Sequence, residues 1–151
     1  MKHHSGVTLV ELLVVLAVFA VLLGFGVPSF RATIETNRIA TVSNDLVAAL
    51  HFARSEAVRR GEDVTLCSSN DQSSCSGAWV DGWVVRNAAN PIRVWPAPRA
   101  GVAIAVGGPV VFNPLGGAAD ARCFNLSLGA LVRSVAVGAA GRVASAAAVC
   151  P

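Results

Sequence analysis

A long apolar stretch near the N-terminus constrains this chain more than any other feature. Residues 7–27 form 21 positions, which as an α-helix would span roughly 31 Å and so match a hydrocarbon core of about 30 Å. Residues 12–27 contain no charged or strongly polar side chain, yet the carboxylate of Glu11 lies just inside the start of the stretch. The short flank before it carries Lys2 and is expected to stay cytoplasmic. The sequence therefore predicts one membrane-crossing helix, with the C-terminal bulk of the chain exported.

Three interpretations of this segment compete: an ordinary secretory signal, a plain membrane anchor and a specialised leader. A secretory signal needs a cleavage site between small residues, which Gly24 and Gly26 just satisfy. A plain anchor needs hydropathy alone. Neither explains Glu11, because a carboxylate inside lipid is disfavoured and is usually functional where it occurs.

The third interpretation depends on residues 5–11, SGVTLVE. This stretch resembles the leader boundary of type IV prepilins and type II secretion pseudopilins, in which a glycine precedes the cut and the fifth mature residue is a glutamate. A cut after Gly6 makes Glu11 the fifth residue. The resemblance implies that the prepilin peptidase, a membrane aspartyl peptidase, cleaves there and N-methylates Val7, although phenylalanine is usual at that place. It also implies that Pro28 kinks the helix.

Elementary electrostatics gives Glu11 a role in this picture. After the cut, the new amino group of Val7 is a cation at the edge of the lipid, and Glu11 lies about one helical turn further along. A carboxylate and an ammonium in a low dielectric each lower the other's desolvation cost when they meet. We interpret Glu11 as an assembly residue that meets this amine in its own chain or in a filament neighbour. The alternative is a stray acid that stays hydrated at the interface.

The helical pattern continues beyond Phe30 as far as Gly61, a good helix terminator that follows two arginines. One helix of about 50 residues, kinked near Pro28, is therefore predicted to enter a soluble domain. Its apolar stripe recurs every three or four residues and consists of Ile39, Val42, Leu46, Leu50, Ala53 and Ala57.

Past Gly61 the apolar periodicity shortens. Short β-rich runs bounded by Gly, Pro, Asn and Asp occupy residues 63–67, 82–86, 92–95, 102–106, 110–112, 123–127 and 131–137. A helix followed by strands predicts an α+β fold in which an antiparallel sheet packs on the helix. We divide the chain into a leader at 1–6, a transmembrane and filament-core helix at 7–30, and a soluble head at 31–151 that is helical to about residue 60 and β-rich beyond.

Four blocks of the chain resemble, in order, the GspH/FimT family of minor pilins and pseudopilins. The blocks are NDLVAALHFARSEAVRRGEDVTLC, WVDGWVV, VVFNPLGG and AAGRVA, and the similarity spans nearly the whole chain. It implies a pilin-like ladle, a long N-terminal helix with a β-sheet head, in or near the tip of a filament. It also implies a single-pass inner-membrane protein with a periplasmic C-terminal domain, later assembled with other pilins or pseudopilins into a pilus or pseudopilus.

Four cysteines, Cys67, Cys75, Cys123 and Cys150, accompany this export signal and indicate disulfides in an oxidising compartment. Four cysteines allow three pairings. Cys67 and Cys75 flank a short polar loop, so a bridge between them is the simplest choice and leaves Cys123 with Cys150. A zinc site is the rival, but the sequence has neither a C-x-x-C motif nor a histidine near these positions.

Positive charge gathers in the C-terminal part of the chain. Residues 31–85 carry five arginines against seven acidic residues, whereas residues 86–151 carry six arginines against Asp120 alone. This asymmetry hints at a surface that faces a polyanion, and the alternative is scattered, solvated arginines.

Some proteins in the family bind DNA through a C-terminal Gly-Arg-x-Arg segment. The matching stretch here, residues 141–144, lacks the second arginine. Arg142, with Arg133 and Arg122, could still contact phosphates of double-stranded DNA, and a purely structural role for these arginines is the favoured alternative.

The sequence contains no catalytic constellation. Its histidines are His3, His4 and His51, and its glycine-rich stretches lack the Lys-Ser/Thr of a phosphate loop, so we expect neither enzyme activity nor a cofactor. The leading hypothesis is a minor pilin of a type IV pilus that supports assembly and DNA uptake. The alternatives are a GspH-type minor pseudopilin of the type II protein secretion system and a DNA-binding receptor at a pilus tip. The motifs above are common to the pilus and secretion alternatives and do not separate them.

Overall fold

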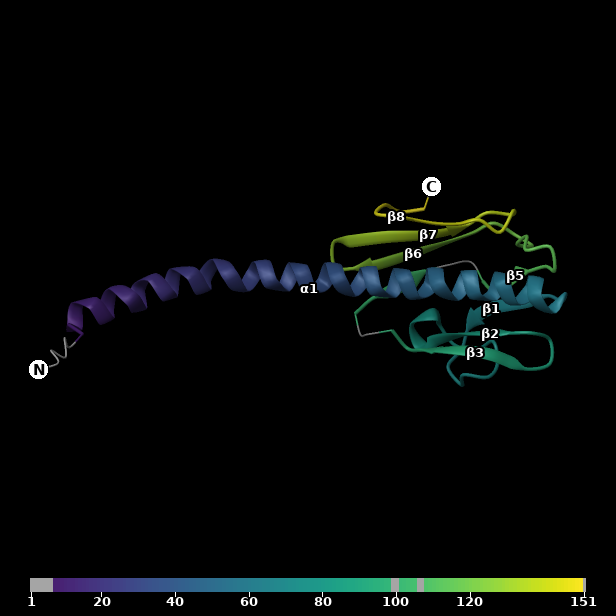
Figure 1. Ribbon diagram of the computed structural model, residues 1–151, viewed down its shortest axis with the longest axis horizontal. Coiled ribbons are helices and arrows are strands. Elements are labelled where there is room, and N and C mark those ends of the chain that lie inside the picture. Colours follow the sequence, from purple (N-terminus) through teal and green to yellow (C-terminus); the bar gives the residue numbers. More distant parts are fainter. Residues whose placement is uncertain (1–6, 99–100, 106–107, 151) are drawn as a thin grey trace, which may run out of the picture. The chain divides into compact units, whose positions relative to one another are not determined.

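The structure is a computed structural model that describes the backbone of residues 7–98, 101–105 and 108–150, with side chains except those of 23–29. The chain divides into two compact units, Met1–Glu35 and Thr36–Pro151. The helix α1, Leu9–Arg60, contributes to both units (Figure 1). Within the described part of the chain, no helix is long and apolar enough to cross a membrane.

Local signals account for both ends of α1. Thr8 lies just before the helix, and its Oγ1 accepts a hydrogen bond of 3.3 Å from the backbone N–H of Glu11. At the other end Gly61 adopts a left-handed φ of 69° and donates its N–H to the carbonyl of Ala57 at 2.9 Å. A glycine reaches this conformation without a steric penalty, which is why the helix stops at Arg60.

The second unit contains two four-stranded antiparallel sheets. Sheet A has the order β3-β2-β1-β5 and sheet B the order β4-β6-β7-β8. The strands of sheet A are β1 (Val64–Ser68), β2 (Gly82–Arg86), β3 (Pro91–Pro96) and β5 (Val110–Phe112), and a 3₁₀ turn, η1 (Trp79–Asp81), leads into β2. The strands of sheet B are β4 (Ala103–Ala105), β6 (Arg122–Leu128), β7 (Leu131–Val137) and β8 (Val143–Ala146).

The predicted α+β fold with antiparallel sheet packed on the helix is confirmed, and the head contains two sheets where the sequence suggested one. Each of the seven predicted β-rich runs corresponds to a strand, but β8 was not predicted. Its sequence VASA has one β-branched residue, and its last three side chains are exposed. Such a strand carries no alternation of apolar and polar residues from which it could be recognised.

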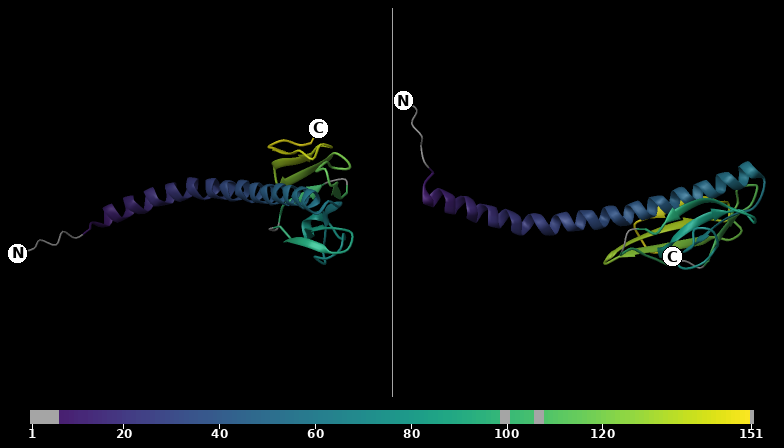
Figure 2. Two further views of the ribbon diagram at one scale, coloured as in Figure 1. Left: turned by 45° about the vertical axis from the view of Figure 1, so that its right-hand side comes forward. Right: turned by 90° about the horizontal axis from the view of Figure 1, so that it is seen from below.

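In the second unit α1 lies across both sheets (Figure 2). The predicted stripe is buried completely, and Ala49 and Ser43 widen it. The buried side chains of the sheets that belong to the same core cluster include Val64, Leu66, Val85, Val110, Phe112, Phe124, Leu126, Val135 and Val137.

Two tryptophans join the sheets within this core. Trp79 of η1 meets the ring of Phe124 edge-on at 4.9 Å between centroids and lies 6.4 Å from Trp83 of β2. Trp83 is only 1% exposed. Because Phe124 belongs to sheet B and Trp83 to sheet A, η1 closes the core between the two sheets.

Candidate functional site

The N-terminal processing segment begins outside the described residues, because Gly6 precedes the first of them. Val7 is 72% exposed. Glu11 lies in the first turn of α1, where a negative charge interacts favourably with the helix dipole. Thr8 and Glu11 have the spacing and residue types of a capping box, whose Thr8 half is present here.

The cap that Thr8 forms by accepting from the backbone N–H of Glu11 was missed at the sequence level, although the Thr-x-x-Glu pattern could have predicted it. The carboxylate of Glu11 therefore lies at the N-terminus of α1, whichever interpretation of the segment is correct. Pro28 lies within the continuous span of α1. Its side chain is outside the described residues, so the kink at this position stays a prediction.

The cysteines form two disulfides. Cys67 of β1 is bonded to Cys75 with 5.4 Å between Cα atoms, and Cys123 of β6 is bonded to Cys150 with 6.0 Å between Cα atoms. The N–H of Cys150 also donates to Asn125 Oδ1 at 2.8 Å. The second bridge therefore holds the end of the chain against sheet B.

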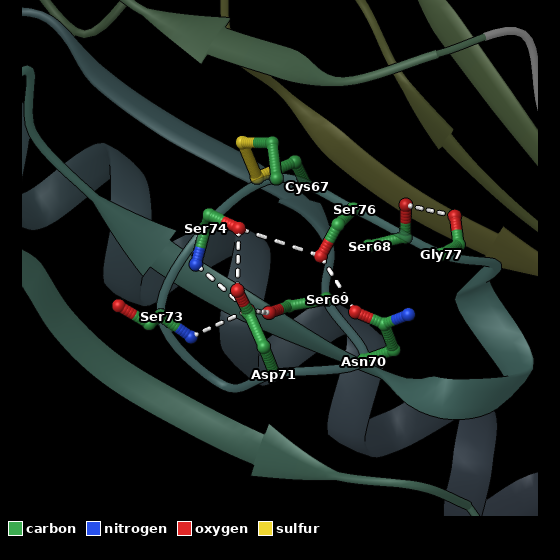
Figure 3. Close-up of a disulfide and its surroundings, with 10 residues drawn as sticks. Cys67, Ser68, Ser69, Asn70, Asp71, Ser73, Ser74, Ser76 and Gly77 are labelled. Carbon is green, nitrogen blue, oxygen red and sulfur yellow. Dashed lines mark hydrogen bonds between the residues drawn. A yellow bond between two sulfur atoms is a disulfide. The ribbon is translucent and has the colours of Figure 1, made fainter.

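The loop closed by Cys67 and Cys75 is organised around Asp71 (Figure 3). Asp71 Oδ1 accepts hydrogen bonds of 2.9 Å from Ser69 Oγ and from the backbone N–H groups of Ser73 and Ser74. Its Oδ2 accepts a bond of 2.6 Å from Ser74 Oγ. These bonds, that of the Ser74 hydroxyl foremost, hold the pKa of the Asp71 carboxyl well below its usual range. The loop is thus fixed both covalently and by its own side chains.

The three arginines proposed to contact DNA all lie on sheet B or at its edge, but the structure does not bring them together. Arg122 Nη2 forms an ion pair of 3.1 Å with Asp120. Arg122 and Val143 both pair with Val137, so Arg142 lies near the same end of the sheet as Arg122. Arg133 pairs with Leu126, four residues from Arg122 and hence about 13 Å along β6.

Close packing explains the glycine that precedes Arg142. Gly141 has a left-handed φ of 72°, and a Cβ on it would collide with the carbonyl oxygen of Gly116 and come within 3.1 Å of Arg54 Nε. The neighbouring N–H of Ala118 donates to the carbonyl of Ala139 at 2.9 Å. Gly141 is therefore required to dock the turn before β8 on the loop after β5 and on α1.

One acidic residue of α1 is buried within the second unit. Glu56 is 8% exposed and accepts hydrogen bonds from Arg59 at 3.1 and 2.6 Å and from Arg60 at 2.7 Å. The bonds from Arg59 and then from Arg60 lower the pKa of the Glu56 carboxyl.

A cluster of one arginine and two aromatic rings was missed at the sequence level. The Cζ atom of Arg93 lies 5.1 Å from the ring centroid of Phe52 and 4.7 Å from that of Trp95. The two rings lie 5.8 Å apart in an edge-to-face arrangement. Strand alternation in β3 could have predicted that Arg93 and Trp95 share a face. The contribution of Phe52 from α1 had no sequence signal.

Among the described residues, no group of three or more His, Cys, Asp or Glu side chains could hold a metal ion. The four cysteines are all engaged in the two disulfides.

Comparison with known proteins identifies the class to which this arrangement belongs. The sequence profile of a family described as "Type II transport protein GspH" matches residues 42–141. The chain belongs to the GspH family. A second profile, the prokaryotic N-terminal methylation motif, matches residues 1–27 of this GspH-family chain. A search of curated proteins finds no match.

Solved structures show the same fold as this GspH-family chain. The type IV minor pilin FimU of Pseudomonas aeruginosa is 22% identical, with a TM-score of 0.61 over 73% of this chain and 89% of FimU. In a second crystal form of FimU the identity is 20% and the TM-score 0.57, over 71% and 91% of the two chains. The minor pseudopilin EpsH of Vibrio cholerae is 12% identical, with a TM-score of 0.55 over 73% and 97%.

The resemblance to GspH/FimT-type minor pilins is therefore confirmed, and this GspH-family chain is a minor pilin or pseudopilin. Such proteins are structural subunits rather than enzymes, assemble with other pilins and are processed by the prepilin peptidase. The methylation motif covers Gly6, Val7 and Glu11, and the GspH match stops at Gly141. Arg142 and Cys150 thus lie beyond the matched part of the family.

Proposed function

We propose that this GspH-family chain is a minor pilin of a type IV pilus that helps the filament to assemble. The observation that carries the proposal is the match of residues 1–27 to the N-terminal methylation motif, with Glu11 five residues after Gly6. The prepilin peptidase would cut between Gly6 and Val7 and methylate the new N-terminus. The subunit would wait in the inner membrane as a single-pass protein with its head in the periplasm and then join other pilins.

The surface of the first unit supports this sequence of events. The described residues 7–22 are exposed and, apart from Thr8 and Glu11, are apolar. Apolar surface of this extent is unfavourable in water and is covered either by lipid or by other apolar helices. The membrane would provide lipid before assembly, and the filament core would provide other apolar helices after it. Glu11 would then set the register by pairing with the amine of Val7 in the same chain or in a neighbour.

The first test is the mature N-terminus in cells that carry a working prepilin peptidase. Mass spectrometry is expected to find a chain that begins at N-methylated Val7. A chain that begins at Val27 would instead support an ordinary secretory signal and overturn the proposal. Glu11→Leu is expected to leave the cut intact and to remove the subunit from filaments, because the amine then lacks its carboxylate. Unchanged incorporation would disprove the registry role.

The main alternative is a minor pseudopilin of a type II secretion system. The description of the family as a type II transport protein favours it, whereas the higher identity and TM-score of the FimU comparison favour the pilus. Deletion of the gene separates the two functions. We expect loss of surface pili with normal secretion of folded exoproteins, and the reverse phenotype would establish the secretion function.

DNA uptake, or service as a DNA receptor at the pilus tip, is the weaker extension of the proposal. Arg142 is exposed, but Arg122 is paired with Asp120 and Arg133 lies further along the sheet. Contacts to phosphates are additive and depend strongly on salt. A gel shift of the full chain with double-stranded DNA at about 50 mM salt tests the extension. Binding that is weakened by Arg142→Ala but not by Arg38→Ala would support it, and no binding at this salt would end it.

A further inference from the structure

The cluster of Phe52, Arg93 and Trp95 holds an exposed guanidinium against two aromatic rings, which core packing does not require. Arg93 lies on the edge strand β3 and is exposed, while the two rings beside it are half-buried. Its guanidinium lies close to both rings, one from α1 and one from its own strand. In each such contact the negative face of the ring attracts the cation. The two rings together therefore hold the guanidinium in one place at the surface.

This guanidinium pairs with no carboxylate among the described residues. Among the described arginines, Arg59 and Arg60 pair with Glu56 and Arg122 pairs with Asp120; of those without an ion pair, Arg93 is the one held by cation–π contacts. A ring contact uses no hydrogen-bond acceptor, so the N–H donors of Arg93 that do not face a ring match the two oxygens of a carboxylate or phosphate. Holding the side chain in advance also removes part of the entropy that binding would otherwise cost.

The surrounding charge distinguishes between the two anions. Residues 62–99, which include most of sheet A, carry four acidic residues against three arginines. Binding to a nucleic acid depends on several cations that neutralise successive phosphates. A region without excess positive charge does not provide them, whereas a single carboxylate needs only one guanidinium.

The strand itself indicates how a neighbour would make contact. β3 begins with Pro91 and ends with Pro96, and proline cannot donate a backbone hydrogen bond to an added strand. Prolines at both ends of β3 hinder the addition of a further strand, which favours recognition through side chains. We propose that Arg93, held against the rings of Phe52 and Trp95, binds an Asp or Glu side chain of a neighbouring pilin subunit. The inference rests on the proposed function, because it assumes that the chain assembles with other pilins.

The lysine content of the chain allows a direct test. Lys2 is the only lysine, and it belongs to the predicted leader. Arg93→Lys would therefore give the mature chain a single lysine, at the proposed contact. A carbodiimide activates a carboxylate, and an amine then displaces the urea to form an amide without a spacer, so residues already in contact are joined preferentially. Treatment of filaments and membranes from cells that produce the full-length variant is expected to join the side-chain amine at position 93 to an Asp or Glu of another pilin, identified by mass spectrometry.

The matched control is Arg142→Lys, which places a lysine at an exposed position beside sheet B; within the described residues the cation–π contacts are those of Arg93, and Arg142 makes none. It is expected to give no such product, or at least several-fold less. Charge reversal by Arg93→Glu is expected to reduce co-purification with other pilins about tenfold, since a charge would then face a like charge. Phe52→Leu should reduce it less, because the charge remains but is no longer held. Both disulfides, checked on non-reducing gels, report that the head has folded.

The outcomes separate this inference from the proposed function. If the wild-type chain is cut after Gly6 and co-purifies with pilins, but the amine introduced by Arg93→Lys couples to no other subunit, the inference is wrong and the proposed function stands. If the wild-type chain is neither cut nor found with pilins, both fail. Binding of a fluorescent single-stranded oligonucleotide that disappears in Arg93→Glu would assign the cluster to nucleic acid and overturn the carboxylate proposal.

Discussion

The two halves of α1 belong to one helix but differ in the pattern of their apolar residues and in what covers them. In the first unit, residues 7–22 are apolar nearly all round and are exposed. In the second unit, residues 39–57 have an apolar stripe of three-to-four-residue spacing, and that stripe is buried under two sheets. The comparison shows that hydropathy alone does not place a residue in the core of its own chain. A helix apolar on every face needs cover from outside, whereas an amphipathic one is covered by its own domain.

The largest expected effect is a loss of stability on substitution in the second half of α1, whereas the same substitution in the first half should have almost none. Leu50→Ala should lower the free energy of unfolding of the head by about 2–5 kcal/mol, since Leu50 is fully buried. Leu16→Ala, the same change on the exposed half, should leave it within about 0.5 kcal/mol. All three tryptophans lie in the second unit, so denaturant unfolding followed by their fluorescence reports on the head alone. Equal destabilisation by both changes would contradict the division between the halves.

Removal of a disulfide tests the same separation between the two units. Cys123 and Cys150 are 27 residues apart in sequence, and their bridge should contribute about 3–4 kcal/mol through the entropy of the unfolded chain. The bridge between Cys67 and Cys75, only 8 residues apart, should contribute about 2–3 kcal/mol. Double serine variants of each pair, compared by chemical unfolding, should differ in this order. The cut after Gly6 is expected to stay unchanged in both, because it concerns the other unit, and defective cutting would show that the units are coupled.

The smallest expected effect concerns two of the carboxylates of α1, Glu11 in the first unit and Glu56 in the second. The folded-state pKa of Glu56 is lowered from an ordinary 4.5, so its ion pairs stabilise the head above that pH and lose their effect as the pH falls through the lowered value. Glu56→Gln should remove about 1 kcal/mol at neutral pH and progressively less in acid. Glu11→Gln should leave the head equally stable at every pH. Thermal unfolding between pH 3 and 7 measures both, and a constant difference for Glu56→Gln would contradict the assignment.

Much of the fold was accessible from local patterns. The stripe from Ile39 to Ala57 has a helical period, and Gly61 ends it, so the helix and its buried face could be predicted from neighbouring residues alone. The seven strong strands have their own composition and turn signals. The processing segment was predicted from an offset of five residues, which is also a local property.

The candidate contacts between distant segments were not accessible in this way. Arg122 could be assigned to a basic surface from the sequence, but its partner Asp120 reduces that role. The contact of Phe52 with Arg93 and the collision that makes Gly141 necessary join residues from different elements. None of these contacts could be predicted from a periodic pattern in the sequence.

By itself, the sequence determined the long helix, its change from an all-round apolar half to an amphipathic half, the strand segments and the processing motif. Each follows from residues within a few positions of one another. The tertiary structure alone decided that β1 pairs with β5 and β4 with β6, so that the eight strands form two sheets, and that Arg93 lies against two rings. The physical reason is that pairing between remote segments is selected by the packing of the whole core and the closure of loops, which no short stretch of sequence contains.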